Sequence, residues 1–64
     1  MPGYYLAHNH LGNTLFAENK NKEAISQYRM AIEIKPDYAD PHYHLGIALV
    51  AEGNNKEAIS HYKM

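Results

Sequence analysis

Apolar residues recur at helical spacing in two consecutive blocks of the chain. In the first block, Ala7, Leu11 and Leu15 lie four residues apart. The second block follows the spacing i, i+1, i+4, i+7, i+8 and consists of Ala24, Ile25, Tyr28, Ala31 and Ile32. Both spacings place the apolar side chains on one face of a helix. The pattern therefore predicts helices near 4–18 and 22–35.

The same pattern returns after 34 residues. When 5–30 is aligned with 39–64, 15 of the 26 positions are identical. The alignment predicts two further helices, near 39–52 and 55–64. A fixed period of this length indicates helical units that stack, because each unit buries its apolar face on its neighbour. We expect an all-α protein with one complete repeat at 5–38 and a second at 39–64 that is truncated in its second helix.

Short polar segments separate the predicted helices. Asn19-Lys20-Asn21 and Gly53-Asn54-Asn55 contain residues that tolerate left-handed backbone and that begin helices. Pro36-Asp37 ends the second helix and opens a turn. The third helix is predicted to begin after Asp37 or after Asp40, and the sequence leaves both starts open.

The repeated unit resembles the tetratricopeptide repeat, a helix-turn-helix unit of 34 residues. The resemblance rests on His8-x-x-Leu11-Gly12-x-x-Leu15, on Ala24-x-x-x-Tyr28 and on Ala31 and Pro36. It implies antiparallel helix-turn-helix repeats stacked as a short right-handed α-solenoid. The usual tryptophan of the family is replaced by His8 and His42. The chain also stops at Met64 without the usual polar capping helix, so we expect an excised fragment or an engineered chain.

Charge and hydropathy exclude two classes of partner. Six Lys and Arg against seven Asp and Glu give a net charge of -1, which is not the basic surface of a nucleic-acid or anionic-membrane binder. The longest apolar run, 47–51, is far shorter than the roughly 20 residues that span a bilayer. The N-terminus also shows no signal segment. We expect a cytoplasmic protein without nucleic-acid or membrane partners.

The histidines do not form a pattern typical of metal binding or catalysis. His8 and His10, like His42 and His44, are two residues apart and therefore point about 200° apart around a helix. We expect His8 and His42 to be packed in the core, and His10 and His44 to be partly exposed. The chain has no cysteine, no Gly-rich phosphate loop and no nucleophile-base pair. The sequence predicts no metal site, no cofactor and no enzymatic activity.

A candidate binding surface emerges where the two units differ. Leu6/Asp40, Asn9/Tyr43, Asn13/Ile47 and Phe16/Val50 all disagree, at spacings that place them on one stripe of the first helix of each unit. In the family, this side of the first helix lines a concave groove that holds peptides. The predicted function is a protein-interaction module that binds a peptide through Asn9, Asn13, Phe16, Tyr43, Ile47 and Val50. The alternative interpretation is that solvent-facing residues simply vary.

The two ends of the repeat array predict a different class of function, self-assembly. Leu11 and Leu15 begin the array with no preceding unit to cover them. Ile59 and Tyr62 lie at the other end with no following unit. Since the units are near copies, the tail of one chain is expected to fit the head of another and to give a homo-oligomer. Stacking end to end and exchange of helices between chains are both open.

Overall fold

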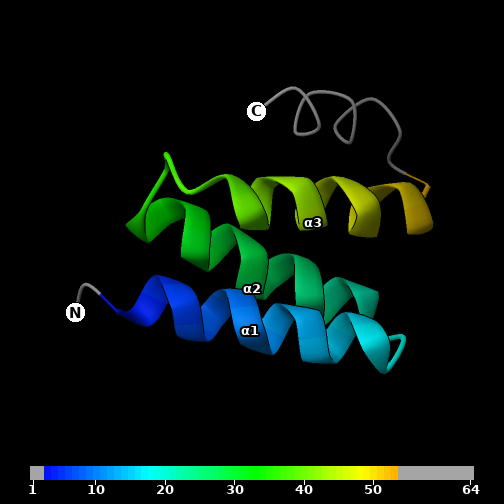
Figure 1. Ribbon diagram of the computed structural model, residues 1–64. Helices are drawn as coiled ribbons and strands as arrows, with labels where there is room; N and C mark the ends of the chain where they lie inside the picture. Colours follow the sequence, from blue (N-terminus) through cyan, green and yellow to red (C-terminus); the bar gives the residue numbers. More distant parts are fainter. Residues whose placement is uncertain (1–2, 54–64) are drawn as a thin grey trace.

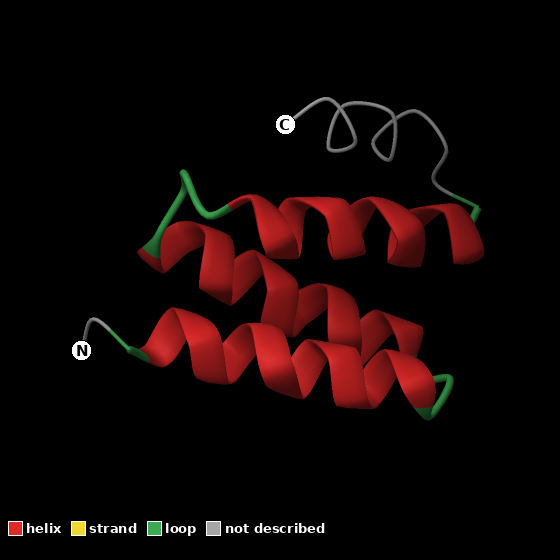
Figure 2. Ribbon diagram, viewed as in Figure 1, coloured by secondary structure: helices red, strands yellow, loops and turns green. Residues whose placement is uncertain are grey.

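The computed structural model describes residues 3–53, which form three α-helices (Figure 1). They are α1 (Tyr4–Ala17), α2 (Asn21–Ile34) and α3 (Ala39–Ala51). Turns join them, and the described residues contain no strand (Figure 2). The predicted all-α class is confirmed, and each helix begins and ends within one residue of its predicted bounds. The fourth predicted helix, 55–64, lies outside the described residues.

The helices are antiparallel to their neighbours, with α2 between α1 and α3 (Figure 1). The Cα atoms extend over 32 × 25 × 12 Å, and the smallest dimension exceeds the roughly 4.6 Å that the Cα atoms of a single helix span. The axes of the three helices therefore do not lie in one plane. Both α1 and α3 pack along α2, whereas α1 and α3 meet each other over a much shorter length.

The core lies between α2 and α3 and is centred on one aromatic side chain. Tyr28 of α2 is fully buried, together with Ala24 on the same helix. From α3, Leu45 and Leu49 complete the buried cluster, and the half-buried Leu15 and Phe16 pack against it from α1. The i, i+4 spacing of Ala24 and Tyr28 is the helical period on which the sequence prediction rested.

Gly12 allows α1 to approach the ring of Tyr28. A Cβ atom at position 12 would lie 2.6 Å from Cε1 and 2.8 Å from Cδ1 of that ring. These separations are far shorter than normal carbon contacts. The glycine is therefore required by the close packing of α1 on α2.

The turn between α1 and α2 ends the first helix through a left-handed residue. Asn19 has φ of 64°. Its N–H donates to the carbonyl of Phe16, and the N–H of Lys20 donates to the carbonyl of Leu15. This pair of hydrogen bonds is the Schellman motif, which satisfies the last carbonyls of a helix. Asparagine is one of the few residues that adopt this backbone conformation readily.

Side chains from α3 and α1 contact the turn between α2 and α3 and hold it in place. His42 is buried, and its Nε2–H donates to the carbonyl of Pro36 over 2.8 Å. From α1, Tyr5 packs edge to face on Tyr38 with ring centroids 5.2 Å apart. The helix begins at Ala39, so of the two predicted starts the structure has the one after Asp37.

The packing around Gly12 gives the first prediction. Gly12→Ala places a methyl group against the fully buried ring of Tyr28, so we expect the free energy of unfolding to fall by about 1 to 3 kcal/mol. Urea denaturation monitored by circular dichroism measures this loss. The matched control is Gly3→Ala, because a Cβ there meets nothing within 4 Å. If both variants are as stable as the unchanged chain, the close contact between α1 and Tyr28 is not a constraint on the fold.

Candidate functional site

The six predicted peptide-binding residues divide equally between α1 and α3. We call the surface that they mark the α1–α3 face: Asn9, Asn13 and Phe16 from α1, and Tyr43, Ile47 and Val50 from α3. Tyr43 is 56% exposed and Val50 is 45% exposed. Asn13, Phe16 and Ile47 are half-buried, and Asn9 is buried. The face therefore offers accessible apolar surface mainly on α3.

The burial of Asn9 differs from the sequence prediction, which placed it on an accessible stripe. Its side chain lies between α1 and α3, where Nδ2 donates to Oδ2 of Asp40 over 2.9 Å. Its Oδ1 is buried and has no hydrogen-bond partner among the described residues. The stripe was placed from the differences between the two repeats and from the helical period, and neither shows where α3 packs on α1. Asn9 joins the two helices of the face instead of lining its surface.

Asn13 is held in a defined orientation by the core. The hydroxyl of Tyr28 donates to Oδ1 of Asn13 over 2.6 Å. This bond turns the oxygen of the amide toward α2 and the NH2 group away from it. Asn13 is only half-buried, so part of its side chain is accessible on the face.

His44 connects the core with the surface of α3. Its ring stacks on the ring of Tyr28, with centroids 5.8 Å apart and planes at 19°. Its Nδ1 lies 2.9 Å from the backbone carbonyl of Asp40, and since a carbonyl can only accept, Nδ1 carries the hydrogen. The same nitrogen is 3.8 Å from Oδ2 of Asp40. His44 also meets the ring of Tyr43 edge to face, with centroids 5.5 Å apart.

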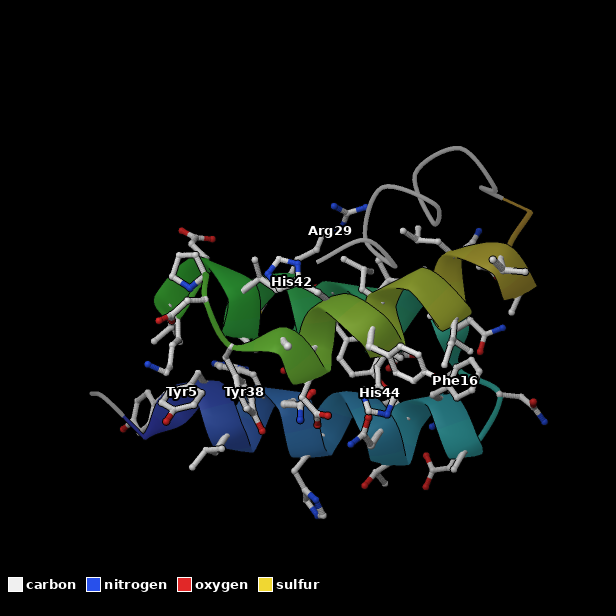
Figure 3. All side chains as sticks on the ribbon, turned by 45° about the horizontal axis from the view of Figure 1, so that its top comes forward. Tyr5, Phe16, Arg29, Tyr38, His42 and His44 are labelled. Atoms are coloured by element: carbon white, nitrogen blue, oxygen red, sulfur yellow. The ribbon has the colours of Figure 1, made fainter. Side chains whose placement is uncertain are left out.

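The labelled side chains of Figure 3 separate two sides of α3. Phe16 of α1 and His44 of α3 lie between these two helices, on the α1–α3 face (Figure 3). His42 lies on the other side of α3, together with Arg29 of α2 (Figure 3). Two histidines of one helix, two residues apart, thus serve different purposes. His42 fixes a turn, and His44 is part of the candidate site.

Asp40 and His44 are the site residues that sequence reasoning did not select. Asp40 belongs to the stripe where the two repeats differ, and this difference from Leu6 is a signal that could have identified it. His44 has an identical counterpart in His10, so a comparison of the repeats cannot separate it from packing residues. Its position on the ring of Tyr28 is visible only in the packed structure.

The remaining histidines also have structural partners. His8 is half-buried and not fully packed in the core, and its Nδ1 hydrogen-bonds to Oε1 of Gln27 over 2.7 Å. His10 is exposed. Within residues 3–53, no three His, Cys, Asp or Glu side chains come together as a metal site.

A hollow of about 350 Å³ lies at the turn between α1 and α2. Its lining residues are Asn19, Lys20, Asn21, Lys22, Glu23 and Glu52. The two lysines and two glutamates balance each other, and Nδ2 of Asn21 lies 3.5 Å from Oε2 of Glu52. This mixed lining selects neither an anion nor an apolar molecule, so the α1–α3 face is the stronger candidate.

The predicted self-association residues differ in how far they are covered. Leu11 is 45% exposed, whereas Leu45, its counterpart in the second repeat, is fully buried against α2. Leu15 is half-buried and packs against the core from α1. Ile59 and Tyr62 lie outside the described residues.

Comparison with known families identifies the repeat. The sequence model of a family described as TPR repeat matches residues 12–53, about two thirds of the chain. The comparison with curated proteins finds no match. Every helix at residues 3–53 is too short or too polar to cross a membrane.

The buried hydroxyl of Tyr28 gives a pH prediction. Burial, together with the nearby Asp40 carboxylate, raises the pKa of Tyr28 from 10.0 to about 12. Since the folded pKa exceeds the unfolded one, the stabilisation is complete below pH 10 and is lost as the pH rises toward about 12. We expect a loss of up to about 2 to 3 kcal/mol across this range in urea denaturation. 

Two variants test whether Tyr28 is the residue responsible. Tyr28→Phe keeps the buried ring and removes the ionising hydroxyl, so its stability should depend less on pH in this range. Tyr4→Phe, at a position that is 54% exposed, should keep the full dependence. Equal slopes for Tyr28→Phe and the unchanged chain would contradict the assignment.

Proposed function

Because the chain belongs to the tetratricopeptide repeat family, whose repeats are protein-interaction modules, we propose that it binds a peptide segment of a protein partner on the α1–α3 face. The observation that carries the proposal is the exposure of Tyr43 and Val50 on α3. Large apolar side chains grouped on one face are typical of binding surfaces. Their counterparts in the first repeat, Asn9 and Phe16, are different residues, as expected for a surface that contacts an irregular ligand.

Polar and apolar groups on the face have complementary tasks in this proposal. The NH2 group of Asn13 donates to a backbone carbonyl of the peptide, while Tyr43, Ile47 and Val50 contact its apolar side chains. Sites of this kind combine a mainly apolar surface with a few placed polar groups. The hydrogen bond from Tyr28 and the packing of Phe16 on the core support a preformed surface, which lowers the entropy cost of binding.

The proposal predicts that binding depends on the exposed Tyr43 and the half-buried Ile47 of α3, and that the fold does not require either side chain. We expect Tyr43→Ala and Ile47→Ala each to weaken binding of a peptide selected from a random library by about fivefold or more. Fluorescence anisotropy measures the affinity, and circular dichroism checks that the helices persist. Ile34→Ala is the control, because it removes a side chain of similar character, 44% exposed, from α2.

Two results would count against this function. If Tyr43→Ala and Ile47→Ala lose helical content, these side chains stabilise the fold and the stripe is core. If Ile34→Ala weakens binding as much as they do, the peptide does not bind on the α1–α3 face.

We propose self-association as a second function, on the evidence of Leu11. The same repeat position is fully buried in Leu45, where α2 covers it, and 45% exposed in Leu11, where no described helix does. The segment 55–64 repeats 21–30 at eight of ten positions. A second copy can therefore present to α1 the same residues that α2 presents to α3. This contact joins two different patches, so it extends into a stack unless the rotation closes a ring.

Sedimentation over a concentration series tests the second function. Continuous growth of the mass indicates stacking, a plateau at the dimer indicates exchange of helices, and a monomer up to the highest concentration contradicts both. Leu11→Glu, like Tyr62→Glu, should shift the mass toward the monomer. The control Leu6→Glu adds the same charge to α1 at a position whose counterpart, Asp40, is exposed on α3, so it should leave the association unchanged.

A further inference from the structure

Resting on the proposed peptide-binding function, we propose that the peptide is basic as well as apolar, and that a lysine or arginine side chain of the peptide pairs with Asp40. The juxtaposition that supports this proposal is a single carboxylate at the end of an apolar row on α3, in which Tyr43 and Val50 are exposed. Tyr43, Ile47 and Val50 follow Asp40 at spacings of 3, 4 and 3, so all four residues share one side of the helix.

The helices that form the α1–α3 face carry only one formal charge. The sequence of α1 contains no Asp, Glu, Lys or Arg. In α3 the only such residue is Asp40. A ligand lying along the face meets the carboxylate of Asp40 near the start of α3, and Glu18 and Glu52 follow the ends of α1 and α3. Neither helix contains a Lys or Arg that would offset Asp40, which favours a cationic group beside it and disfavours a carboxylate.

The carboxylate of Asp40 is accessible to a ligand. The side chain is 48% exposed. Its two side-chain contacts, the hydrogen bond from Asn9 and the approach of His44, both use Oδ2. Among the described residues, no Lys or Arg forms an ion pair with it. Oδ1 thus remains available to an ammonium or guanidinium group, while the contacts of Oδ2 hold the carboxylate in place.

The other charged residues near Asp40 do not provide this cation. Asp37, on the turn before α3, is paired with Lys35 over a distance of 3.4 Å, and its side chain is 83% exposed. Lys35 also lies over the ring of Tyr5, 5.6 Å from its centroid. Lys35 therefore contacts both Asp37 and Tyr5 at the turn between α2 and α3. Asp40 is the acidic residue on the α1–α3 face itself.

The length of the row sets the size of the ligand. From position 40 to position 50, a helix rises about 15 Å. An extended peptide covers this length with about five residues, and alternate side chains point to the same side. The favoured ligand therefore has a basic residue at one end and apolar residues at alternate positions after it.

Three peptides that differ in one residue test the inference. Each is capped at both termini, is about six residues long and alternates leucine with serine after an end residue that is Lys, Gln or Glu. A second set carries the variable residue at the other end, because the direction of the chain on the face is not fixed. We expect the Lys peptide of one set to bind about two- to fivefold more tightly than the Gln peptide, and the Glu peptide to bind most weakly.

Variants of the chain assign this preference to Asp40. Asp40→Asn keeps an oxygen that accepts from Asn9 and removes the charge, so the Lys and Gln peptides should then bind equally. Asp37→Asn removes a charge of the same type from the turn and should leave the preference unchanged. Added salt should reduce the preference in the unchanged chain, because the pair is partly exposed.

The outcomes separate this inference from the function on which it rests. If the three peptides bind equally and Tyr43→Ala weakens all of them, the peptide-binding function stands and the basic preference is wrong. A preference for lysine that survives Asp40→Asn also overturns the assignment to Asp40. If no peptide of either set binds, this inference fails, and selection from the random library then decides the peptide-binding function independently.

Discussion

The position of the Tyr28 ring is the constraint on which the rest of the structure depends. The ring is fully buried and lies against all three helices: Gly12 of α1 is beside it, its own helix carries it, and His44 of α3 stacks on it. Its hydroxyl is satisfied by Asn13, so a polar group is buried without an unpaired donor. One side chain thereby sets the distance of α1 from α2 and the rotation of α3 about its axis.

The proposed binding surface is an extension of this same contact. Asn13 and His44 each touch Tyr28 on one side and the α1–α3 face on the other. His44 in turn hydrogen-bonds to the backbone of Asp40, whose carboxylate accepts from Asn9. The polar groups offered to a ligand are therefore oriented by the core, and such support lowers the cost of ordering them on binding.

Sequence reasoning recovers the parts of the fold that depend on local periodicity. The helices follow from the apolar spacing, the left-handed turn follows from Asn19, and the small residue at position 12 follows from the repeat. The sequence did not show that Asn9 is buried, because its partner Asp40 is 31 residues away. His44 was missed for the same reason, since its stacking depends on the rotation of α3 relative to α2. The exposure of Tyr43 and Val50 was predicted because it follows from the helical period and the comparison of the two repeats, which require no knowledge of how the helices pack.

The short contact between α1 and α3 has a consequence for the order of folding. Most of the contacts join helices that are adjacent in sequence, so the entropy cost of closing the chain between them is low. Chains of this kind fold quickly and can begin from one pair of helices. The α1–α2 hairpin can form with its own Schellman turn and the Gly12 contact, and α3 then adds to it. On this pathway the hydrogen bond between Asn9 and Asp40 is among the last native interactions to form, so the surface offered to a partner exists only once all three helices have assembled.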